Sequence, residues 1–282
     1  MTFVVEHPGH GSLLQDLGRP GMGHLGVGAS GAFDRGALRQ VNALLGNDVG
    51  AAAVETYGGL VLRVQEPHVI AVAGAAGPVL IDGRPVASGR ATPVRAGQRL
   101  VIEPPTIGLR TYLGAAGGIA APPELGSASS DTLSGLGPPL LAAGQILAIA
   151  PSGPIPWLDD VPALGRSGDI VLDVVLGPRD DWFTPASVRR LLQDAWQVSP
   201  TSDRVGVRLD GSVLERVVHH ELPSEPVVRG SIQVSAAGQP MIFGPDHPVT
   251  GGYPVIAVVT DPHTDRLAQA RPGQVVRFSR VG

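Results

Sequence analysis

Glycine and proline interrupt this sequence at short intervals along its whole length. Of the 282 residues, 39 are Gly and 27 are Pro, and aromatic residues make up only 4%. Both residue types mark turns, because glycine weakens element interiors and proline removes a backbone hydrogen-bond donor. The hydrophobic fraction of 43% is that of a globular chain. We therefore expect a mainly β fold of many short strands, such as LVLRV (60–64), HVIAVAG (68–74) and VIAVVT (255–260).

Two segments carry the signals of a helix. In the first, Asp34 is placed to cap the N-terminus and Gly46 to end the helix. In the second, Thr184 is placed to cap the N-terminus, and Pro185 suits the first helical turn. Apolar residues at three- and four-residue spacing predict the buried faces, namely Ala37, Leu38, Val41, Leu44 and Leu45 in the first helix and Val188, Leu191, Leu192 and Ala195 in the second.

A short internal repeat supports the β-rich interpretation. A Gly-Gln turn that enters a strand occurs in VRAGQRLVI (94–102), LLAAGQILAI (140–149) and ARPGQVVRF (270–278). In each copy the glycine can supply a left-handed turn, and the alternating residues after it can pair into a sheet. The repeat informs about architecture and not about activity.

The segment between residues 150 and 169 is rich in Pro and Gly and has no clear hydrophobic period. We interpret it as a linker between two related β-barrel domains, each with about one helix. The predicted domains are residues 1–160 and residues 161–282.

Composition excludes several chemistries. All 21 basic residues are Arg, and Cys is absent. Within these residues there is thus no lysine for a Schiff base, a P-loop or attached biotin, and no thiolate nucleophile or metal ligand. The net charge of −4 and the scattered arginines argue against nucleic-acid binding. The N-terminus lacks a signal-peptide pattern and the longest apolar run is short and rich in Gly, so we expect no membrane span and a cytoplasmic location.

The segment GVGASG (26–31) matches the G-x-G-x-x-G pattern of dinucleotide-binding turns. That turn requires a buried strand directly before the first glycine, whereas the residues before Gly26 include Gly18, Pro20, Gly21 and Gly23. We therefore expect no NAD or FAD site. A glycine-rich loop before a helix can still hold an anion, and the alternative is a loop that only caps the helix.

Two further segments offer candidate groups. GPDHPVTGGYPVIAV (244–258) places Asp246, His247, Thr250 and Tyr253 around two adjacent glycines, which is typical of either an elaborate hairpin or a substrate loop. DRVGVRLDG (203–211) alternates Arg204, Gly206 and Arg208 on one face of a predicted strand. Such a row of arginines can form salt bridges or an anion clamp, and the spacing favours salt bridges. The eight His residues show no metal-ligand spacing, so no metal site is predicted.

The ordered motifs resemble those of the biotin-dependent carboxyltransferase-like family, which is also called allophanate hydrolase subunit 2 or KipA. The matching segments are QDLGRPG (15–21), GVGASGAFD (26–34), VNALLGN (41–47), VET (54–56), LGSASSD (125–131), LGPRDDWFT (176–184), SDRVGVRLDG (202–211), GSIQVSAAGQP (230–240), DHPVTGGYP (246–254) and LAQARPGQVVRF (267–278). They span nearly the whole chain, and the C subunit of bacterial 5-oxoprolinase is the branch that the chain resembles most.

This resemblance implies two cyclophilin-like β-barrel domains and a partner of the subunit-B or KipI type. For the 5-oxoprolinase branch it implies ATP-dependent opening of 5-oxoproline to glutamate, together with a subunit-A lactam hydrolase and with ATP bound at a partner interface. Two alternatives stay open. One is a urea- or allophanate-related carboxyltransferase or hydrolase, and the other is a non-catalytic KipA-type regulator that binds a kinase-inhibitor protein.

The predicted site binds a small amide or lactam that bears a carboxylate. Its acid/base candidates are Asp34, Glu55 and Tyr253, with helix capping as the alternative role of Asp34. The predicted substrate-binding residues are Arg19, Gly28, Ser30, Arg204, Gln233, Thr250, Gly251 and Gly252. Relatives usually carry an Arg or Lys where this chain has Ala128, so Arg19 or Arg204 would have to supply the charge.

Overall fold

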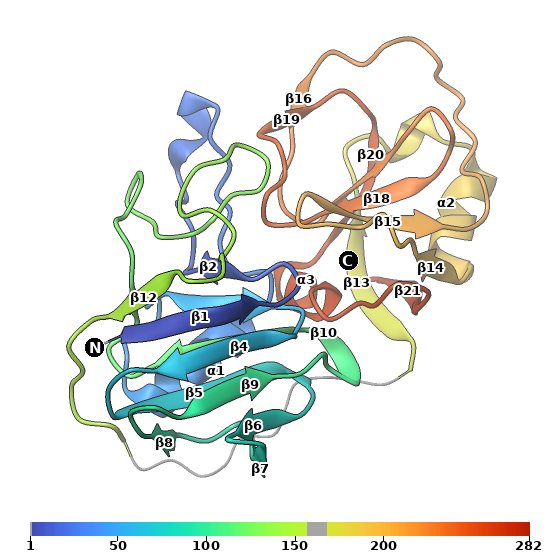
Figure 1. Cartoon of the computed structure of the whole chain (residues 1–282). Coiled ribbons are helices and arrows are strands. Elements are labelled where there is room, and N and C mark those ends of the chain that lie inside the picture. Colours follow the sequence, from blue (N-terminus) through green and yellow to red (C-terminus); the bar gives the residue numbers. More distant parts are fainter. Residues whose placement is uncertain (1, 157–167) are drawn as a thin grey trace. The chain divides into compact units, whose positions relative to one another are not determined.

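Strands make up most of the structure, as the spacing of glycine and proline predicts, and they fold into two units (Figure 1). The structure, a computed structural model, describes residues 2–156 and 168–282. The N-terminal unit comprises residues 2–19, 30–131 and 135–156, and the C-terminal unit comprises residues 20–29, 132–134 and 168–282. The predicted boundary between residues 160 and 161 lies outside the described residues.

The N-terminal unit, blue to green in Figure 1, consists of two antiparallel sheets and one helix. The seven-stranded sheet has the order β11-β12-β1-β4-β9-β6-β7 and the five-stranded sheet the order β2-β3-β10-β5-β8. The strand bounds are β1 Thr2–Pro8, β2 Leu13–Gln15, β3 Ala53–Thr56, β4 Leu60–Val64, β5 His68–Ala76, β6 Val79–Ile81, β7 Arg84–Val86, β8 Thr92–Val94, β9 Arg99–Ile102, β10 Ile107–Ala115, β11 Ile119–Ala120 and β12 Ile146–Ile149. Large residues from both sheets, among them Phe3, Leu62, Ile70 and Leu113, share one core.

The helix of this unit, α1 (Arg35–Leu45), packs on the other face of the five-stranded sheet. Strand β5 alternates Ile70 and Val72 toward the shared core with Ala71 and Ala73 toward α1. These small side chains let the helix approach closely, and at Gly114 a Cβ atom would already lie 3.0 Å from Leu45. All five predicted apolar positions of α1 are buried, and both predicted boundary residues are confirmed.

The C-terminal unit contains a closed barrel, yellow to red in Figure 1, in the order β13-β20-β17-β18-β15-β14-β21. Its strands are β13 Ile170–Leu176, β14 Trp196–Val198, β15 Gly206–Asp210, β17 Ser231–Val234, β18 Pro240–Phe243, β20 Val255–Val259 and β21 Val275–Arg280, and a separate ribbon pairs β16 Glu225–Pro226 with β19 Thr250–Gly251. Burial alternates along β13, where Leu172 and Val174 are buried and Val171 and Val175 are exposed. This alternation is typical of a barrel strand with one inward face.

The helices of the C-terminal unit differ in part from the expectation. Helix α2 (Pro185–Gln193) has the predicted Thr184 cap, but Leu191 alone of its predicted apolar stripe is fully buried, and Ala195 lies exposed beyond the helix end. A second helix, α3 (Asp261–Leu267), was not predicted, because its seven residues carry too few apolar positions to show a period. Short 3₁₀ turns lie at η1 (Met22–Leu25) and η2 (Asp180–Trp182). Among the described residues, no helix is long and apolar enough to cross a membrane.

The three copies of the repeat form the same turn. Gly97, Gly144 and Gly273 have φ of 81°, 82° and 80°, the left-handed conformation that the sequence predicts. In each copy the Gln side chain closes the turn by accepting a hydrogen bond from the backbone N–H three residues earlier, at 2.7, 3.0 and 3.1 Å. Strands β9, β12 and β21 then follow, so a local signal determines where each of them begins.

Candidate functional site

The predicted site residues fall into two groups, one in each unit. Arg19, Ser30, Asp34 and Glu55 belong to the N-terminal unit. Gly28, Arg204, Gln233 and the segment 250–253 belong to the C-terminal unit.

The G-x-G-x-x-G segment is an irregular connection. Gly26 ends η1 with φ of 75°, and a Cβ atom at Gly28 would lie 3.0 Å from the carbonyl oxygen of His247. Gly31 has φ of 95° and lies against the backbone of Leu17 and Gly18. No strand leads into the segment, since β2 ends at Gln15 and pairs antiparallel with β3. The glycines allow close backbone contacts and do not form a dinucleotide-binding turn.

Asp34 caps helix α1. Its carboxylate accepts a hydrogen bond from the backbone N–H of Ala37 at 2.8 Å, and the residue is 3% exposed. Its own N–H donates to the Tyr112 hydroxyl at 2.8 Å. The capping role that the sequence suggested is therefore present, and an acid/base role stays a prediction.

Glu55, on β3, is the centre of a buried polar cluster. Its carboxylate accepts a hydrogen bond from Phe33 N–H at 3.0 Å and one from the Tyr112 hydroxyl on β10. The Nε atom of Arg110 lies 3.4 Å from the other carboxylate oxygen. Both charged side chains are almost completely buried, at 2% and 3% exposure. These contacts hold the Glu55 carboxylate in the interior of the N-terminal unit.

The cation of this cluster is held by aromatic rings. The guanidinium of Arg110 lies 4.1 Å from the ring centroid of Phe33 and donates to the Tyr57 hydroxyl at 3.1 Å. Burial, and then the nearby charges of Glu55 and Asp34, raise the pKa of Tyr112 well above its ordinary value of 10.0. The cluster thus joins the start of α1 to strands β3 and β10.

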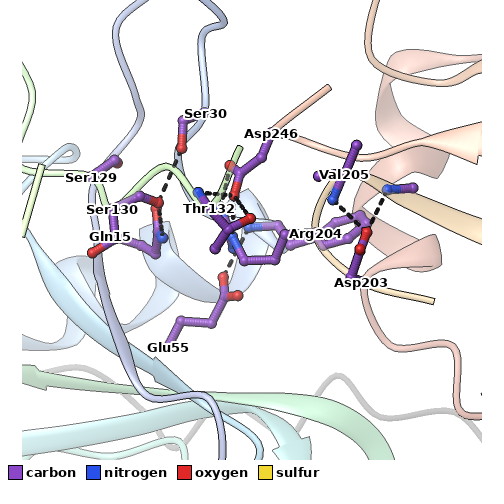
Figure 2. A network of polar contacts seen from close by, with 12 residues as sticks. Gln15, Ser30, Glu55, Ser129, Ser130, Thr132, Asp203, Arg204, Val205 and Asp246 are labelled. Atoms are coloured by element: carbon purple, nitrogen blue, oxygen red, sulfur yellow. Dashed lines mark hydrogen bonds and ion pairs between the residues drawn. The ribbon is translucent and has the colours of Figure 1, made fainter. Parts of the chain in front are cut away.

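A second polar group surrounds the loop of residues 124–131. The carboxylate of Asp16 accepts hydrogen bonds from the hydroxyls of Ser127 and Ser129 and from Ala128 N–H. Figure 2 shows Gln15 and Ser30 pointing to the carbonyl oxygen of Ser130, to which they donate at 2.8 and 3.2 Å. The loop is therefore held by Gln15 at the end of β2, by Asp16 directly after it and by Ser30.

Arg19 and Ser30, both predicted substrate-binding residues, contact this loop. Arg19 is 2% exposed and donates from Nε to the carbonyl of Glu124 at 3.3 Å and from Nη2 to that of Ser129. Ser30 has φ of 54°, a left-handed conformation that is unfavourable for a residue with a Cβ atom. Strain of this kind is a reason to test Ser30 for function.

In the C-terminal unit Arg204 pairs with Asp246. The Nε and Nη2 atoms donate to the two carboxylate oxygens at 2.9 and 3.0 Å, and the side chains are 3% and 0% exposed. Asp246 also accepts from the N–H and the hydroxyl of Thr132 at 2.9 and 2.7 Å (Figure 2). The salt bridge favoured by the spacing is present. Arg204 itself lies before β15 and not on the strand, because Asp203 accepts from the backbone N–H groups of residues 205 and 206 and forms a turn there.

Gln233, Gly251 and Tyr253 come together on one side of the barrel. Gln233, on β17, is 5% exposed and donates from Nε2 to the carbonyl of Tyr253 at 2.9 Å. The same amide fills the space where a side chain at Gly251 would project. The ring of Tyr253 is 48% exposed, and the guanidinium of Arg216 lies 5.7 Å from its centroid. Thr250 and Gly252 lie beside them and are exposed.

A cavity of about 370 Å³ lies next to this cluster. Its polar lining includes Gln233, Tyr253 and Arg208, and Leu209, Pro240 and Met241 provide apolar surface. Its size is within the range of small-molecule sites, which are about 300–1,000 Å³. Arg208 was noted in the sequence for its alternation with Arg204 and was not proposed as a site residue. Only the three-dimensional arrangement brings it to the same cavity as Gln233 and Tyr253.

A metal site is not evident. Among residues 2–156 and 168–282, no group of three or more His, Cys, Asp or Glu side chains is placed to hold a metal ion.

Comparison with known proteins gives matches along nearly the entire chain. Residues 25–280 match the family of carboxyltransferase domains, subdomains A and B. The chain is 37% identical to the C subunit of 5-oxoprolinase from Escherichia coli, covering 94% of this chain and 86% of that protein. It is 35% identical to the C subunit of 5-oxoprolinase from Haemophilus influenzae, covering 95% of this chain and 87% of that protein.

A solved structure shows the same fold. The crystal structure of the K. lactis urea amidolyase aligns over 100% of this chain with a TM-score of 0.92 and 27% identity. The chain spans only 19% of that longer protein. The mainly β fold expected from the sequence and its resemblance to the carboxyltransferase family are both confirmed.

Replacing Tyr112 by Phe should reveal the energetic role of the Glu55 cluster. Loss of the hydroxyl leaves Asp34 N–H and Glu55 without one partner each, which should lower the free energy of unfolding at pH 7 by about 1–3 kcal/mol. Above pH 10 the unfolded chain loses a tyrosine proton that the folded wild type retains, so wild-type stability falls as pH rises through this range. Urea unfolding at pH 7, 9 and 10.5 should therefore show the difference between wild type and variant shrinking.

The sequence contains no lysine that would titrate in the same range. Tyr253→Phe, which alters an exposed ring, serves as the control. A stability difference for Tyr112→Phe that stays constant across pH would contradict the assignment of the buried phenol.

The second stability prediction concerns the buried ion pair. Arg204→Met should lower the free energy of unfolding by roughly 3–5 kcal/mol, because it leaves Asp246 buried without its cation. Arg277→Met removes an arginine that is 46% exposed and should leave stability close to that of the wild type. Urea unfolding at neutral pH compares the two, and equal effects would refute the claim that burial makes the Arg204 pair important.

Proposed function

Because the chain belongs to the family of carboxyltransferase domains, subdomains A and B, we propose that it is one component of an ATP-dependent 5-oxoprolinase complex. The observation that carries the proposal is its similarity, along nearly its full length, to two relatives that are each named as the C subunit of 5-oxoprolinase. Their names describe one component of an enzyme, so partners are part of the proposal. We assign these partners as a subunit-B or KipI-type protein and a subunit-A lactam hydrolase.

The proposed reaction opens a cyclic amide. Water cleaves the lactam C–N bond of 5-oxoproline to give glutamate, while ATP is converted to ADP and phosphate. Transfer of the γ-phosphoryl group of ATP to the lactam oxygen, with ADP leaving, would activate the amide. One water then opens the C–N bond to give an acyl phosphate, and a second water releases phosphate and leaves glutamate. ATP is assigned to a partner or to the interface with a partner, and no biotin is attached to these residues because they contain no lysine.

The cavity of the C-terminal unit suits such a substrate. Arg208 offers a cation to a carboxylate, and the apolar surface of Leu209 and Met241 suits a small ring. Tyr253 brings an exposed phenol to this cavity, and its O–H can donate or accept a proton, so we assign it the acid/base role. Gln233 orients it by holding its backbone carbonyl, and Gly251 makes room for the Gln233 amide.

Asp34 and Glu55 fit positioning better than proton transfer. Asp34 caps α1, and the Glu55 carboxylate is surrounded by Phe33 N–H, Tyr112 and Arg110. We assign both residues to holding the start of α1 in place.

A second candidate function is supported by the fold comparison. The close structural match to the K. lactis urea amidolyase favours a carboxyltransferase that acts on urea or a related amide. In that case a carboxyl group would arrive on biotin carried by another chain. The two candidates differ in substrate, so one experiment separates them.

Co-purification with the B-type and A-type partners followed by assays of ATP turnover tests the proposal. We expect ADP release that depends on 5-oxoproline, with glutamate formed in equal amount, and no stimulation by urea or allophanate. Stimulation by urea alone would replace the proposal with the second candidate. A stable complex without turnover of any of these substrates would overturn both and favour a regulatory role.

Variants of the cavity then test the site in the same complex. Tyr253→Phe should lower kcat by about 10²–10⁴-fold, the range of a general acid or base. Arg208→Gln should raise KM for 5-oxoproline about tenfold or more, since hydrogen bonds to charged groups contribute about 1.5–3 kcal/mol. Arg277→Gln, an exposed arginine of another strand, is the matched control and should leave both constants unchanged. Unaltered kcat and KM in the two cavity variants would show that the substrate does not bind in this cavity.

A further inference from the structure

Arg19 is a buried cation that pairs with no anion among the described residues. Its side chain is 2% exposed, and its hydrogen bonds go to two backbone carbonyls, those of Glu124 and Ser129. Within the described part of the chain, no carboxylate lies within salt-bridge distance of it, and its Nη1 atom is buried without a hydrogen-bond partner. A buried charge without a counter-ion costs several kcal/mol. The arrangement therefore lacks a negative group.

Two further polar atoms near Arg19 also lack a hydrogen-bond partner. The Oγ atom of Ser130 and the Oε1 atom of Gln15 are buried and have no partner among the described residues. Arg19 binds the carbonyl of Ser129, and Gln15 binds the carbonyl of the next residue, Ser130. The three atoms without a partner thus belong to Ser130 itself and to two side chains that are hydrogen-bonded to the backbone of Ser129 and Ser130.

Two carboxylates that contact the loop of residues 124–131 are already engaged. Asp16 accepts hydrogen bonds from the loop at Ser127, Ala128 and Ser129, and the Glu124 carboxylate accepts one from Gly137 N–H. Arg204, the other arginine expected to supply charge, is paired with Asp246. Arg19 is therefore the one of these two predicted arginines whose charge is left for a ligand.

We infer that Arg19, Ser130 and Gln15 form a binding site for a small oxyanion, a phosphate or a carboxylate group. Arg19 Nη1 and the Ser130 hydroxyl donate to its oxygens. Gln15 Oε1 can only accept, so it favours an oxyanion that also carries an O–H or N–H donor, such as hydrogen phosphate. The strained backbone of Ser30, whose hydroxyl donates to the Ser130 carbonyl, holds this stretch from the other side.

The Arg19 guanidinium lies close to exposed residues of the loop. The carbonyl that Arg19 Nε binds belongs to Glu124, which is exposed, and Leu125 and Gly126 beside it form a turn with φ of 50° and 83°. Two backbone hydrogen bonds between Glu124 and Ser127 close this turn, so a small ion reaches Arg19 when the turn shifts. This site lies in the N-terminal unit, whereas the cavity lined by Arg208 belongs to the C-terminal unit, so it goes beyond the proposed function.

Ligand-dependent thermal unfolding of the isolated full chain tests the inference without any turnover. Inorganic phosphate and sodium acetate are titrated separately, with sodium chloride at matched ionic strength as the reference. We expect a saturable rise in Tm with phosphate, because a ligand that binds only the folded state stabilises it. Calorimetry should show that Arg19→Gln and Ser130→Ala each weaken binding, about tenfold or more for Arg19→Gln. Arg277→Gln removes the same charge from the surface and should bind as the wild type does.

Each outcome either supports or overturns the inference of an oxyanion site. A saturable response to acetate in place of phosphate would support the oxyanion site and identify a carboxylate as its ligand. No saturable response to either anion would overturn the inference, as would full binding by a folded Ser130→Ala protein, which keeps the backbone carbonyl and loses only the hydroxyl. None of these results depends on 5-oxoproline hydrolysis, so the proposed function can fail while this site stands.

Discussion

The N-terminal unit depends on one buried carboxylate. Glu55 accepts hydrogen bonds from the backbone before α1 and from Tyr112 on β10, and its charge is opposed by Arg110. Burial of a carboxylate is tolerated only when donors surround it, so these groups must be in place together. The small residues of β5 and β10 then let α1 lie against the sheet in the orientation that its start imposes. Packing and polar contacts therefore reinforce each other around the same helix.

The C-terminal unit follows the same rule with Asp246, which accepts hydrogen bonds from Arg204 and from Thr132. In both units a buried acid is surrounded by donors and opposed by an arginine. Arg19 is buried as deeply and faces only carbonyl groups. This contrast, more than any single distance, distinguishes charges that hold the fold from a charge that awaits a ligand.

Local signals in the sequence were sufficient to predict many of the helix ends and turns. The caps at Asp34 and Gly46, the apolar face of α1 and the turns at Gly97, Gly144 and Gly273 all involve residues within a few positions of one another. The predictions were less accurate where tertiary contacts determine whether a helix forms and where it ends. Ala195 has the right spacing for the stripe of α2, but the helix ends at Gln193. Helix α3 is too short to show a period.

The sequence indicated which residues could belong to a site, but it did not indicate the partners or the role of each one. Spacing could suggest a salt bridge for Arg204 but could not identify Asp246, 42 positions away, as its partner. Nor could it show that Arg208 reaches the cavity of Tyr253, or that Arg19 has no carboxylate beside it among the described residues. These facts depend on which segments become neighbours in the fold, and a pattern in one segment carries no information about the segment beside it.

The interleaving of the two units has a consequence for synthesis. Residues 20–29 and 132–134 leave the ribosome early, yet they belong to the unit whose other residues begin at 168. Thr132 meets Asp246 only after more than a hundred further residues have been made. Until the barrel is made, these two stretches therefore lack the contacts with its residues that they make in the folded protein, such as those of Gly28 with His247 and of Thr132 with Asp246. The last barrel strand, β21, ends at Arg280, so the barrel is made only when the chain is complete to that residue.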